Sequence, residues 1–249
     1  MTAILTARNI EKIYENRREH VEVLTDVHLA IQAQEFVCVV GPSGCGKTTL
    51  LKILGGLREP NRGEILFEGS ALEASKRRIG FVFQEANLMP WRTVEGNIRL
   101  PLELHQETDQ AFRVQELIDL VGLQGFESTY PDDLSGGMAQ RVAIARALVH
   151  EPEVLLLDEP FGSLDALTRE RMGMELQRIR QARMVTVIMV THSISEAVLL
   201  GDRVVVLSDR PATVKREVAI PLKRPRTLEM KHTADFGRVV KRVRHAIQA

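Results

Sequence analysis

The stretch GPSGCGKTT (Gly41–Thr49) decides the fold of this chain, because its spacing is that of loops that hold phosphate groups. It follows the apolar run FVCVV (Phe36–Val40) and leads into KTTLLKILGGL, a pattern typical of a helix. In a Gly-x-x-x-x-Gly-Lys-Thr loop, the glycines let backbone N–H groups curl around a β-phosphate at a helix N-terminus. Strand, loop and helix in this order predict a nucleotide-binding site rather than an ordinary glycine-rich turn.

The residue types in the loop suit different parts of a nucleotide. We expect Lys47 to neutralise oxygens of the β- and γ-phosphates and the Thr48 hydroxyl to ligate Mg²⁺. Cys45 is interpreted as a small spacer; the alternative is an oxidation-sensitive thiolate, because a helix N-terminus lowers the pKa of a thiol. The other residues of the expected nucleotide-binding loop are Gly41, Pro42, Ser43, Gly44, Gly46 and Thr49.

Composition and charge argue against several classes of protein. At 249 residues, 44% of them hydrophobic, the chain is long enough for one large domain or a domain with a subdomain. Lys plus Arg and Asp plus Glu both total 33, which argues against a dedicated nucleic-acid binder. No run approaches the ~18 apolar residues of a membrane-spanning helix, and the N-terminus lacks a signal-peptide pattern. With only two cysteines, these features predict a cytoplasmic protein that neither crosses a membrane nor is exported.

The order of the expected elements predicts an α/β fold. The β-like runs ILTARNI, EVLTDVHLAI, GEILFEG and RIGFVF come first, and residues 88–150 then have a mostly helical pattern. The runs VLLLD, MVTVIMV and RVVVLSD are nearly continuous in apolar residues, as expected of parallel strands buried on both faces. Together they predict a largely parallel sheet covered by helices.

The run VLLLDEP (Val154–Pro160) supplies the carboxylates that a phosphate loop requires. Its apolar residues place Asp158 at the carboxyl end of a buried strand, where it would hold Mg²⁺ through water. Glu159 beside it would polarise an attacking water. Alone, the run also fits a strand that ends in a solvated acidic turn, but beside Gly41–Thr49 it indicates a nucleotide hydrolase.

The stretch LSGGMAQRVAIARAL (Leu134–Leu148) separates this chain from kinases and GTPases with similar loops. Ser135, Gly136 and Gly137 open a long amphipathic helix, which predicts a second anion-binding N-terminus. One nucleotide has no obvious use for two such sites in one subunit, and the alternative is a plain helix cap. On these residues the sequence resembles the ATP-binding cassette (ABC) family, in which this signature caps the γ-phosphate of ATP bound to the partner subunit.

The resemblance covers residues 1 to 220. It implies a P-loop NTPase (RecA-like) core with an antiparallel β subdomain and an inserted helical signature subdomain at about 88–150. Tyr14 would stack on adenine, and Gln84 in FVFQE would sense Mg²⁺ and the transport partner. Asp165 in GSLD would belong to the loop that crosses the dimer interface. With Glu159, Gln84 would be one of the catalytic residues.

The third catalytic residue that the resemblance implies is His192 in VTHS, the switch that contacts the γ-phosphate. Without this context, a histidine after a strand is more often a surface or core residue. The following sequence, from Ser193 to Glu196, predicts a capping box, which would hold His192 on a rigid turn between a strand and a helix.

The signature departs from the family at its fifth position, where Met138 replaces the common glutamine. A thioether cannot donate the hydrogen bonds of an amide, so contacts of that side chain to phosphate or ribose are lost. Ser135 Oγ and the Gly137 N–H remain, and we expect weaker polar contact rather than inactivity. GSLD in place of Ser-Ala-Leu-Asp is a milder change.

The segment QEANLMPWRTVEGNIRLPLE (Gln84–Glu103) bears on what the energy of ATP drives. It holds the only tryptophan, Trp91, with Leu88 and Met89 in a turn-like stretch. This apolar cluster is either subdomain core or a cleft for a helix of another protein. With EPFGSLDALTR and VLSDRPATVKREVAIPLKRPR, the segment looks like the importer ATPases for nitrate, sulfonate, taurine and related small solutes. That resemblance implies a separate membrane permease whose coupling helix enters the cleft.

Residues 221–249 are predicted to form a basic, amphipathic tail. From Asp209 onward the sequence has eleven Lys and Arg against four Asp and Glu. One face of the expected helix in TADFGRVVKRVRHAIQA carries Phe236, Val239, Val240, Val243 and Ile247, and the cations lie largely on the other. The helix either packs onto the cassette with a solvated basic face or is attracted to the anionic inner leaflet beside the permease.

The family resemblance implies an ATPase subunit that dimerises around ATP and Mg²⁺, with itself or with a paralogous subunit, on the cytoplasmic face of the inner membrane. Its partners would be permease subunits and, indirectly, a solute-binding protein, but no nucleic acid. The alternatives are a soluble ABC ATPase of DNA repair or translation, an ABC subunit for lipids or export, and a P-loop small-molecule kinase. The first normally needs a second cassette or a basic nucleic-acid face, and a kinase would not need LSGGM or the Asp165 loop.

Overall fold

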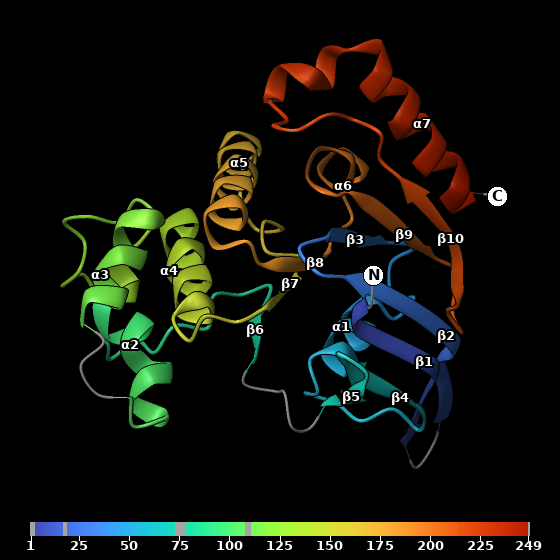
Figure 1. Cartoon of the computed structure of the whole chain (residues 1–249), viewed down its shortest axis with the longest axis horizontal. Coiled ribbons are helices and arrows are strands. Elements are labelled where there is room, and N and C mark those ends of the chain that lie inside the picture. Colours follow the sequence, from blue (N-terminus) through green and yellow to red (C-terminus); the bar gives the residue numbers. More distant parts are fainter. Residues whose placement is uncertain (1–2, 17–18, 73–77, 108–110, 249) are drawn as a thin grey trace. The chain divides into compact units, whose positions relative to one another are not determined.

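The computed structural model describes residues 3–16, 19–72, 78–107 and 111–248. It divides into two compact units. The first contains residues 1–76 and 186–249, and the second contains residues 77–185. Both units combine strands with helices, which confirms the predicted α/β class (Figure 1).

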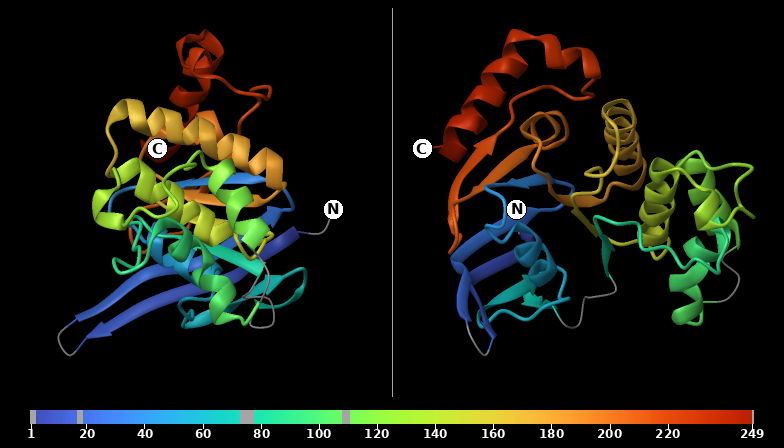
Figure 2. Two further views of the ribbon diagram at one scale, coloured as in Figure 1. Left: turned by 90° about the vertical axis from the view of Figure 1, so that its left-hand side faces the viewer. Right: turned by 180° about the vertical axis from the view of Figure 1, so that it is seen from behind.

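One sheet of the first unit is antiparallel, in the order β2-β1-β4-β5. The strands are β1 (Ala3–Asn16), β2 (Glu19–Gln32), β4 (Arg62–Phe67) and β5 (Ser70–Ala71). β1 and β2 are longer than the predicted runs and pair along most of their length as a two-stranded ribbon (Figure 2). Within the first unit, this sheet is the antiparallel β subdomain that the family resemblance implies.

The other strands of the first unit carry the phosphate loop. β3 (Phe36–Val40) lies between β8 (Thr186–Val190) and β9 (Arg203–Leu207) and pairs with both in parallel. β10 (Val214–Ala219), an antiparallel neighbour of β9, is not among the predicted strands. Every residue of β3 and β8 is buried, as the nearly continuous apolar runs predict.

Three helices pack on these strands. α1 (Lys47–Leu54) follows the phosphate loop and contacts β8, and α6 (Ile194–Leu200) contacts β3 and β9. α7 (Ala234–Gln248), preceded by the short helix η3 (Leu228–His232), lies along β9 and β10 and against α6 (Figure 1).

The predicted apolar face of the tail helix is confirmed with one adjustment. Phe236, Val239 and Val243 are buried together with Ala246, while Val240 and Ile247 are half-buried. The tail packs onto the strands of the first unit, and the cations on its other face are exposed; these are Arg238, Lys241, Arg242 and Arg244.

The second unit pairs two short parallel strands with helices. Its elements are β6 (Ile79–Val82), α2 (Val94–Leu104), α3 (Ala111–Leu120), η2 (Pro131–Asp133), α4 (Gly136–Leu148), β7 (Val154–Asp158) and α5 (Ala166–Arg183). β6 and β7 pair in parallel, and α2, α3 and α4 pack on one another (Figure 1). Residues 88–150, predicted to be mostly helical, contain four of these helices.

The signature helix α4 differs from its predicted amphipathic pattern. The consecutive residues Val142, Ala143, Ile144 and Ala145 are all buried, so the middle of the helix is enclosed on every side rather than apolar on one face. Small alanines allow neighbouring elements to approach closely. Among the helices in the described ranges, none combines the length and apolarity that crossing a bilayer requires.

Candidate functional site

The loop between β3 and α1 adopts a conformation that its glycines make possible. Gly46 has φ 118°, and a Cβ atom there would lie 2.7 Å from Val23 Cγ1. Gly44 has φ 71°, in the same left-handed region. The Gly46 carbonyl already accepts from the Leu50 N–H at 2.8 Å, so α1 begins immediately after the loop. The backbone N–H groups of the first turn are therefore gathered at a helix N-terminus, as anion binding requires.

Lys47 lies within the curl of this loop. Its Nζ donates to the Gly41 carbonyl at 3.1 Å and to the Pro42 carbonyl at 2.8 Å, and the residue is 7% exposed. An ammonium group has three donors, and a buried cation is stabilised by charged acceptors. The loop thus holds a positive charge at its centre, where phosphate oxygens would be neutralised.

Cys45 is 1% exposed, and its burial raises the pKa of its thiol despite the opposing charge of Lys47. The predicted alternative of an activated thiolate is therefore wrong, because desolvation outweighs the helix terminus and the neighbouring ammonium. Cys38 in β3 is likewise a buried, free cysteine. The spacer interpretation of Cys45 agrees with this environment.

Tyr14, in β1, lies beside the first turn of α1. Its hydroxyl is 3.4 Å from the Thr49 hydroxyl, and its half-buried ring would serve as the stacking surface for adenine. Two cations lie over the ring: the Arg58 guanidinium at 5.1 Å and Lys12 Nζ at 5.6 Å from the ring centroid. Neither cation was predicted, since only the fold brings residue 58 to β1.

His192 follows β8 on the side of the sheet where the phosphate loop follows β3. Val190 is paired with Val39, and the Thr191 N–H donates to the Val39 carbonyl at 3.2 Å. His192 is exposed, whereas Thr191 beside it is 2% exposed. The carboxyl ends of two parallel strands thus bring the histidine and the loop to one edge, as the family resemblance implies.

The turn at His192 is only half of the predicted capping box. Ser193 Oγ accepts from the Glu196 N–H at 3.3 Å, as predicted. The Ser193 N–H, however, donates to Thr191 Oγ1 at 3.0 Å, and that hydroxyl donates to Glu196 Oε2 at 2.7 Å. In a complete capping box the Glu196 side chain would accept from the Ser193 N–H. Here the buried Thr191 hydroxyl lies between them, because it needs both a donor and an acceptor.

In the second unit, Gln84 and Glu159 follow adjacent strands. Val82 of β6 pairs with Leu157 of β7, so the residues after both strands emerge at one edge. A methyl group on Gly162 would lie 3.7 Å from both Gln84 Nε2 and Glu159 Oε2. The structure therefore brings these two predicted catalytic side chains together around Gly162.

The two acidic residues at the end of β7 differ in exposure. Asp158 closes the strand at 5% exposure, whereas Glu159 is half-buried. Glu159 has φ 45°, a conformation that turns the chain sharply after the strand. Asp158 thus lies at the carboxyl end of a buried strand, as its apolar run predicts.

Ser135 and Asp165 are the N-caps of consecutive helices. Ser135 Oγ accepts from the Met138 N–H at 3.3 Å, and Asp165 accepts from the Leu167 and Thr168 N–H groups, both at 3.1 Å. The hydrogen bonds from Thr168 lower the pKa of the Asp165 carboxyl. Both caps are exposed, as is Gly136, so they line a solvent-facing surface of the second unit.

Gly137 packs closely in this region, since a Cβ atom there would lie 2.9 Å from Thr168 Cγ2. A side chain at this position would have to displace the first turn of α5. The glycine therefore lets α4 and α5 approach, in addition to the phosphate role that the sequence predicts for its N–H.

Two residues of α4 that the sequence did not single out hold the segment after Gln84. Gln140 Nε2 donates to the Phe83 carbonyl at 3.4 Å, and Arg146 donates to the Ala86 and Asn87 carbonyls at 2.7 and 2.9 Å. Burial lowers the pKa of Arg146. Only the fold shows that the signature helix and this segment are in contact.

Trp91 is 71% exposed, which excludes the interpretation of its ring as subdomain core. Leu88 and Met89 are half-buried. The turn that presents Trp91 is fixed by Asn97, a fully buried residue of α2 whose side chain bonds to the backbone of Met89, Arg92 and Thr93. The ring is therefore a rigidly supported apolar surface group.

Comparison with known proteins identifies the class. Residues 24–162 match the family described as ABC transporter, and the chain belongs to this family. It is 41% identical over 239 residues to the aliphatic sulfonates import ATP-binding protein SsuB of Bacillus cereus, covering 96% of this chain and 94% of that protein. It is 47% identical over 219 residues to the nitrate import ATP-binding protein NrtC of Synechococcus elongatus, covering 86% of this chain and 33% of NrtC.

Among solved structures, the dimeric, post-hydrolysis state of the ATP-binding cassette MJ0796 bound to ADP and Pi is similar to this chain. The TM-score is 0.78 and the identity 34%, over 88% of this chain and 100% of that one. The predicted resemblance and the predicted P-loop ATPase fold are thus both confirmed.

Proposed function

We propose that this chain is the ATP-hydrolysing subunit of a membrane importer for a small solute such as nitrate, a sulfonate or taurine. The observation that carries the ATPase assignment is Lys47, a nearly buried cation held by the carbonyls of its own glycine loop at the start of α1. The solute class is supported by the import functions in the names of SsuB and NrtC.

In this proposal each ATP is bound by one subunit and capped by another. Tyr14 stacks on the adenine, the loop Gly41–Thr49 holds the phosphates, and the helix N-termini at Ser135 and Asp165 receive the phosphates of a nucleotide on another subunit. The exposure of both caps supports this role, because an N-terminus enclosed within its own unit has no access to such a ligand.

The residues present fit a magnesium ion. Thr48, Gln84 and Asp158 offer hydroxyl, amide and carboxylate oxygens, which are the hard ligands that Mg²⁺ prefers. When bound, the ion would neutralise charge that develops on the phosphate oxygens during cleavage. The protein holds Asp158 at the end of a fully buried strand, where it is 5% exposed.

Glu159 is the general base in this proposal. It is half-buried at a strand end, where a carboxylate can accept a proton from a water molecule while its backbone is held by the Gly162 N–H at 3.0 Å. Gln84 near it orients the water, and His192 donates a hydrogen bond to the γ-phosphate. Each role depends on side chains placed at the carboxyl ends of strands.

The proposed partners are a second ABC subunit and a permease. Two copies of this chain would close on ATP, each supplying Ser135, Gly137 and Asp165 to the loop of the other; the dimeric state of the MJ0796 cassette supports this assembly. Trp91 is proposed to contact a cytoplasmic helix of the permease, which places the chain on the cytoplasmic face of the inner membrane. A solute-binding protein would act only through the permease.

Reconstitution tests the proposal as a whole. The chain would be purified with its permease, inserted into proteoliposomes with the solute-binding protein, and supplied with Mg-ATP on the side that carries the chain. We expect ATP-dependent uptake of labelled nitrate, taurine or an alkyl sulfonate. ATP hydrolysis without uptake of any of these solutes would exclude the solute class, and the absence of ATP hydrolysis would exclude the enzymatic assignment.

A further inference from the structure

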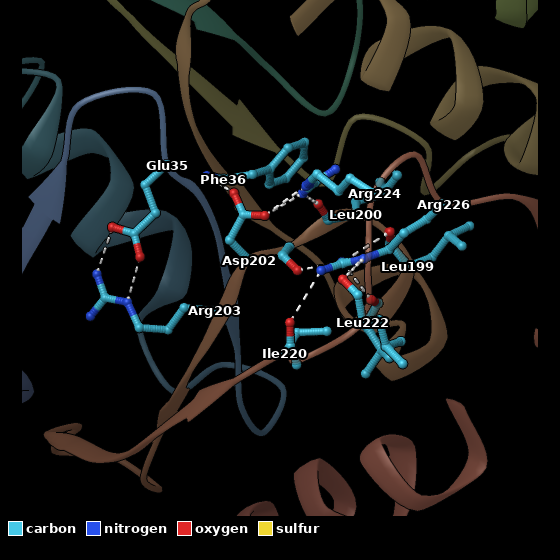
Figure 3. A network of polar contacts seen from close by, with 12 residues as sticks. Glu35, Phe36, Leu199, Leu200, Asp202, Arg203, Ile220, Leu222, Arg224 and Arg226 are labelled. Carbon is cyan, nitrogen blue, oxygen red and sulfur yellow. Dashed lines mark hydrogen bonds and ion pairs between the residues drawn. The ribbon is translucent and has the colours of Figure 1, made fainter. Parts of the chain in front are cut away.

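Two arginines of the segment that follows β10 donate hydrogen bonds to backbone carbonyls of α6 (Figure 3). This helix begins at Ile194, two residues after His192. Arg226 is 1% exposed and is the largest of the fully buried side chains in the described part of the chain. Its Nη1 donates to three carbonyls at the end of α6, those of Val198, Leu199 and Gly201, at 3.0, 3.3 and 2.6 Å. A cation at this position faces the negative end of the helix and satisfies carbonyls that lack intrahelical partners.

The same guanidinium also binds its own segment. Nε donates to the Leu222 carbonyl at 3.2 Å, and Nη2 donates to the Ile220 carbonyl at 3.3 Å. Arg226 is therefore a junction between residues 220–222 and the C-terminal end of α6. Figure 3 shows these carbonyls converging on the guanidinium from both sides.

Arg224 extends the junction to the strand that feeds the phosphate loop. Its Nη2 donates to the Leu200 carbonyl at 2.5 Å, and its Nε donates to Asp202 Oδ1 at 2.7 Å. The other oxygen, Asp202 Oδ2, accepts from the N–H of Phe36, the first residue of β3, at 2.9 Å. The C-terminal segment is thereby joined to both α6 and β3.

The opposite end of α6 carries His192. Thr191, Ser193 and Glu196 form the hydrogen-bonded turn described above, and the helix between that turn and Gly201 has only seven residues. At 1.5 Å per residue the helix is about 10 Å long. Such a short, buried helix moves as one body, so a displacement at its C-terminal end also displaces the turn at His192.

We propose that Arg224 and Arg226 are positioning residues that hold His192 in register with the phosphate loop through α6. The inference rests on the proposed function, which assigns His192 to the γ-phosphate. This proposal gives the C-terminal segment a role in the rate of ATP hydrolysis. The hydrogen bonds of the two arginines described above lead to α6, to Asp202 and to residues 220–222, so the effect on the loop Gly41–Thr49 is indirect.

The test compares Arg224→Gln, Arg226→Lys and Arg226→Met in the full chain. We expect Arg224→Gln to lower kcat for ATP hydrolysis by roughly ten- to a hundredfold, as a misplaced catalytic group does, with nearly unchanged KM for ATP. Arg226→Lys should retain more activity than Arg226→Met, because it keeps the charge at the end of α6. Loss of the buried Arg226 charge is expected to destabilise the chain. Arg224 is only half-buried, so the Arg224→Gln variant should still fold and allow kcat to be measured.

Arg203→Gln is the matched control. The Arg203 side chain is 16% exposed and donates to Glu35 (Figure 3). It also donates to Glu217 and the Ala30 carbonyl, and none of these three residues belongs to α6. We expect this variant to lower the melting temperature while kcat of the folded protein stays near that of the wild type. An equal loss of kcat in Arg203→Gln would overturn the proposal in favour of general destabilisation.

A double-mutant cycle separates positioning from stability. In a His192→Ala background, Arg224→Gln should cause no further loss of kcat, because the group that it positions is already absent. Additive losses would overturn the proposal. Normal activity of Arg224→Gln beside an inactive His192→Ala variant would mean that only this inference fails. Full activity of His192→Ala would mean that the assignment of His192 in the proposed function fails.

Discussion

The Tyr14 hydroxyl and the Thr49 hydroxyl lie 3.4 Å apart, which joins the antiparallel sheet to the first turn of α1. Tyr14 belongs to β1 and Thr49 to the helix that follows the loop Gly41–Thr49, so the surfaces proposed to bind the base and the phosphates are held at a fixed spacing. Because the ring also lies beneath the Arg58 guanidinium, its orientation is restrained from two directions.

The first prediction follows from this arrangement. Tyr14→Ala should weaken ATP binding by about 1–3 kcal/mol, the range for loss of one base–aromatic stack. Tyr14→Phe should bind nearly as well as the wild type, because stacking needs the ring and only the bond to Thr49 is lost. Titration calorimetry in the absence of hydrolysis measures both values. Equal affinities of the Ala variant and the wild type would exclude Tyr14 from the adenine site.

The second prediction concerns Glu159 as general base. Glu159→Gln should retain ATP binding, lose hydrolysis by roughly two to four orders of magnitude, and accumulate as an ATP-bound dimer. Steady-state ATPase assays and size-exclusion chromatography with ATP check these outcomes. Glu151→Gln, at an exposed carboxylate just before β7, is the control and should hydrolyse ATP normally. Near-normal turnover in Glu159→Gln would refute the assignment.

The third prediction uses the exchange of signatures between subunits. Subunits with Lys47→Ala and subunits with Ser135→Arg should each be inactive alone, and mixing them should restore part of the ATPase activity. One of the two sites in a mixed dimer then has both an intact loop and an intact signature. If each loop were completed by the signature of its own chain, mixing would give no recovery.

The fourth prediction concerns Trp91 as a docking residue. Trp91→Ala should leave ATP affinity and the melting temperature nearly unchanged, because the ring is 71% exposed. It should weaken co-purification with the permease by on the order of 2 kcal/mol or more, the cost of truncating an interface anchor, and abolish solute uptake. Phe112→Ala, at an 82% exposed aromatic of α3, is the matched control and should leave co-purification intact. Unimpaired docking of Trp91→Ala would remove the segment Gln84–Glu103 from the coupling surface.

The fifth prediction follows from the raised pKa of Cys45. A raised pKa means that the thiolate forms only at higher pH, so iodoacetamide should modify Cys45 more slowly in the folded protein than in the urea-unfolded chain. The rate in the folded protein should rise only above the usual thiol pKa. Peptide mass spectrometry after timed alkylation reads both rates, and rapid modification at neutral pH would restore the thiolate interpretation.

The sequence predicted the elements whose chemistry is local. A phosphate loop depends on glycines and a lysine at fixed spacing, and fully buried parallel strands require nearly continuous apolar runs, so β3, β7, β8 and β9 were all recognisable. The start of α4 was likewise predictable, because an N-cap serine is a signal carried by one residue and its immediate neighbours.

What the sequence did not predict depends on partners far away in the chain. β10 (VKREVA) carries charges on its exposed face, which obscured a strand defined by its pairing with β9. Arg58 reaches Tyr14 and Arg146 reaches Ala86 only through the fold, so no local pattern reveals them. Arg226 lies in the predicted basic tail, yet it is buried because five backbone carbonyls, three of them at the end of α6, offer the acceptors that water would otherwise supply.

The burial of Arg226 sets a limit for anyone who wishes to shorten this protein. A version that stops at residue 220, just after β10, would keep every motif of the nucleotide site and would look complete to a motif search. It would also uncover the end of α6 and leave the Val198, Leu199 and Gly201 carbonyls without their donor. We expect the minimal autonomous ATPase to extend beyond Arg226, so a miniaturised or fused cassette should be joined after that residue.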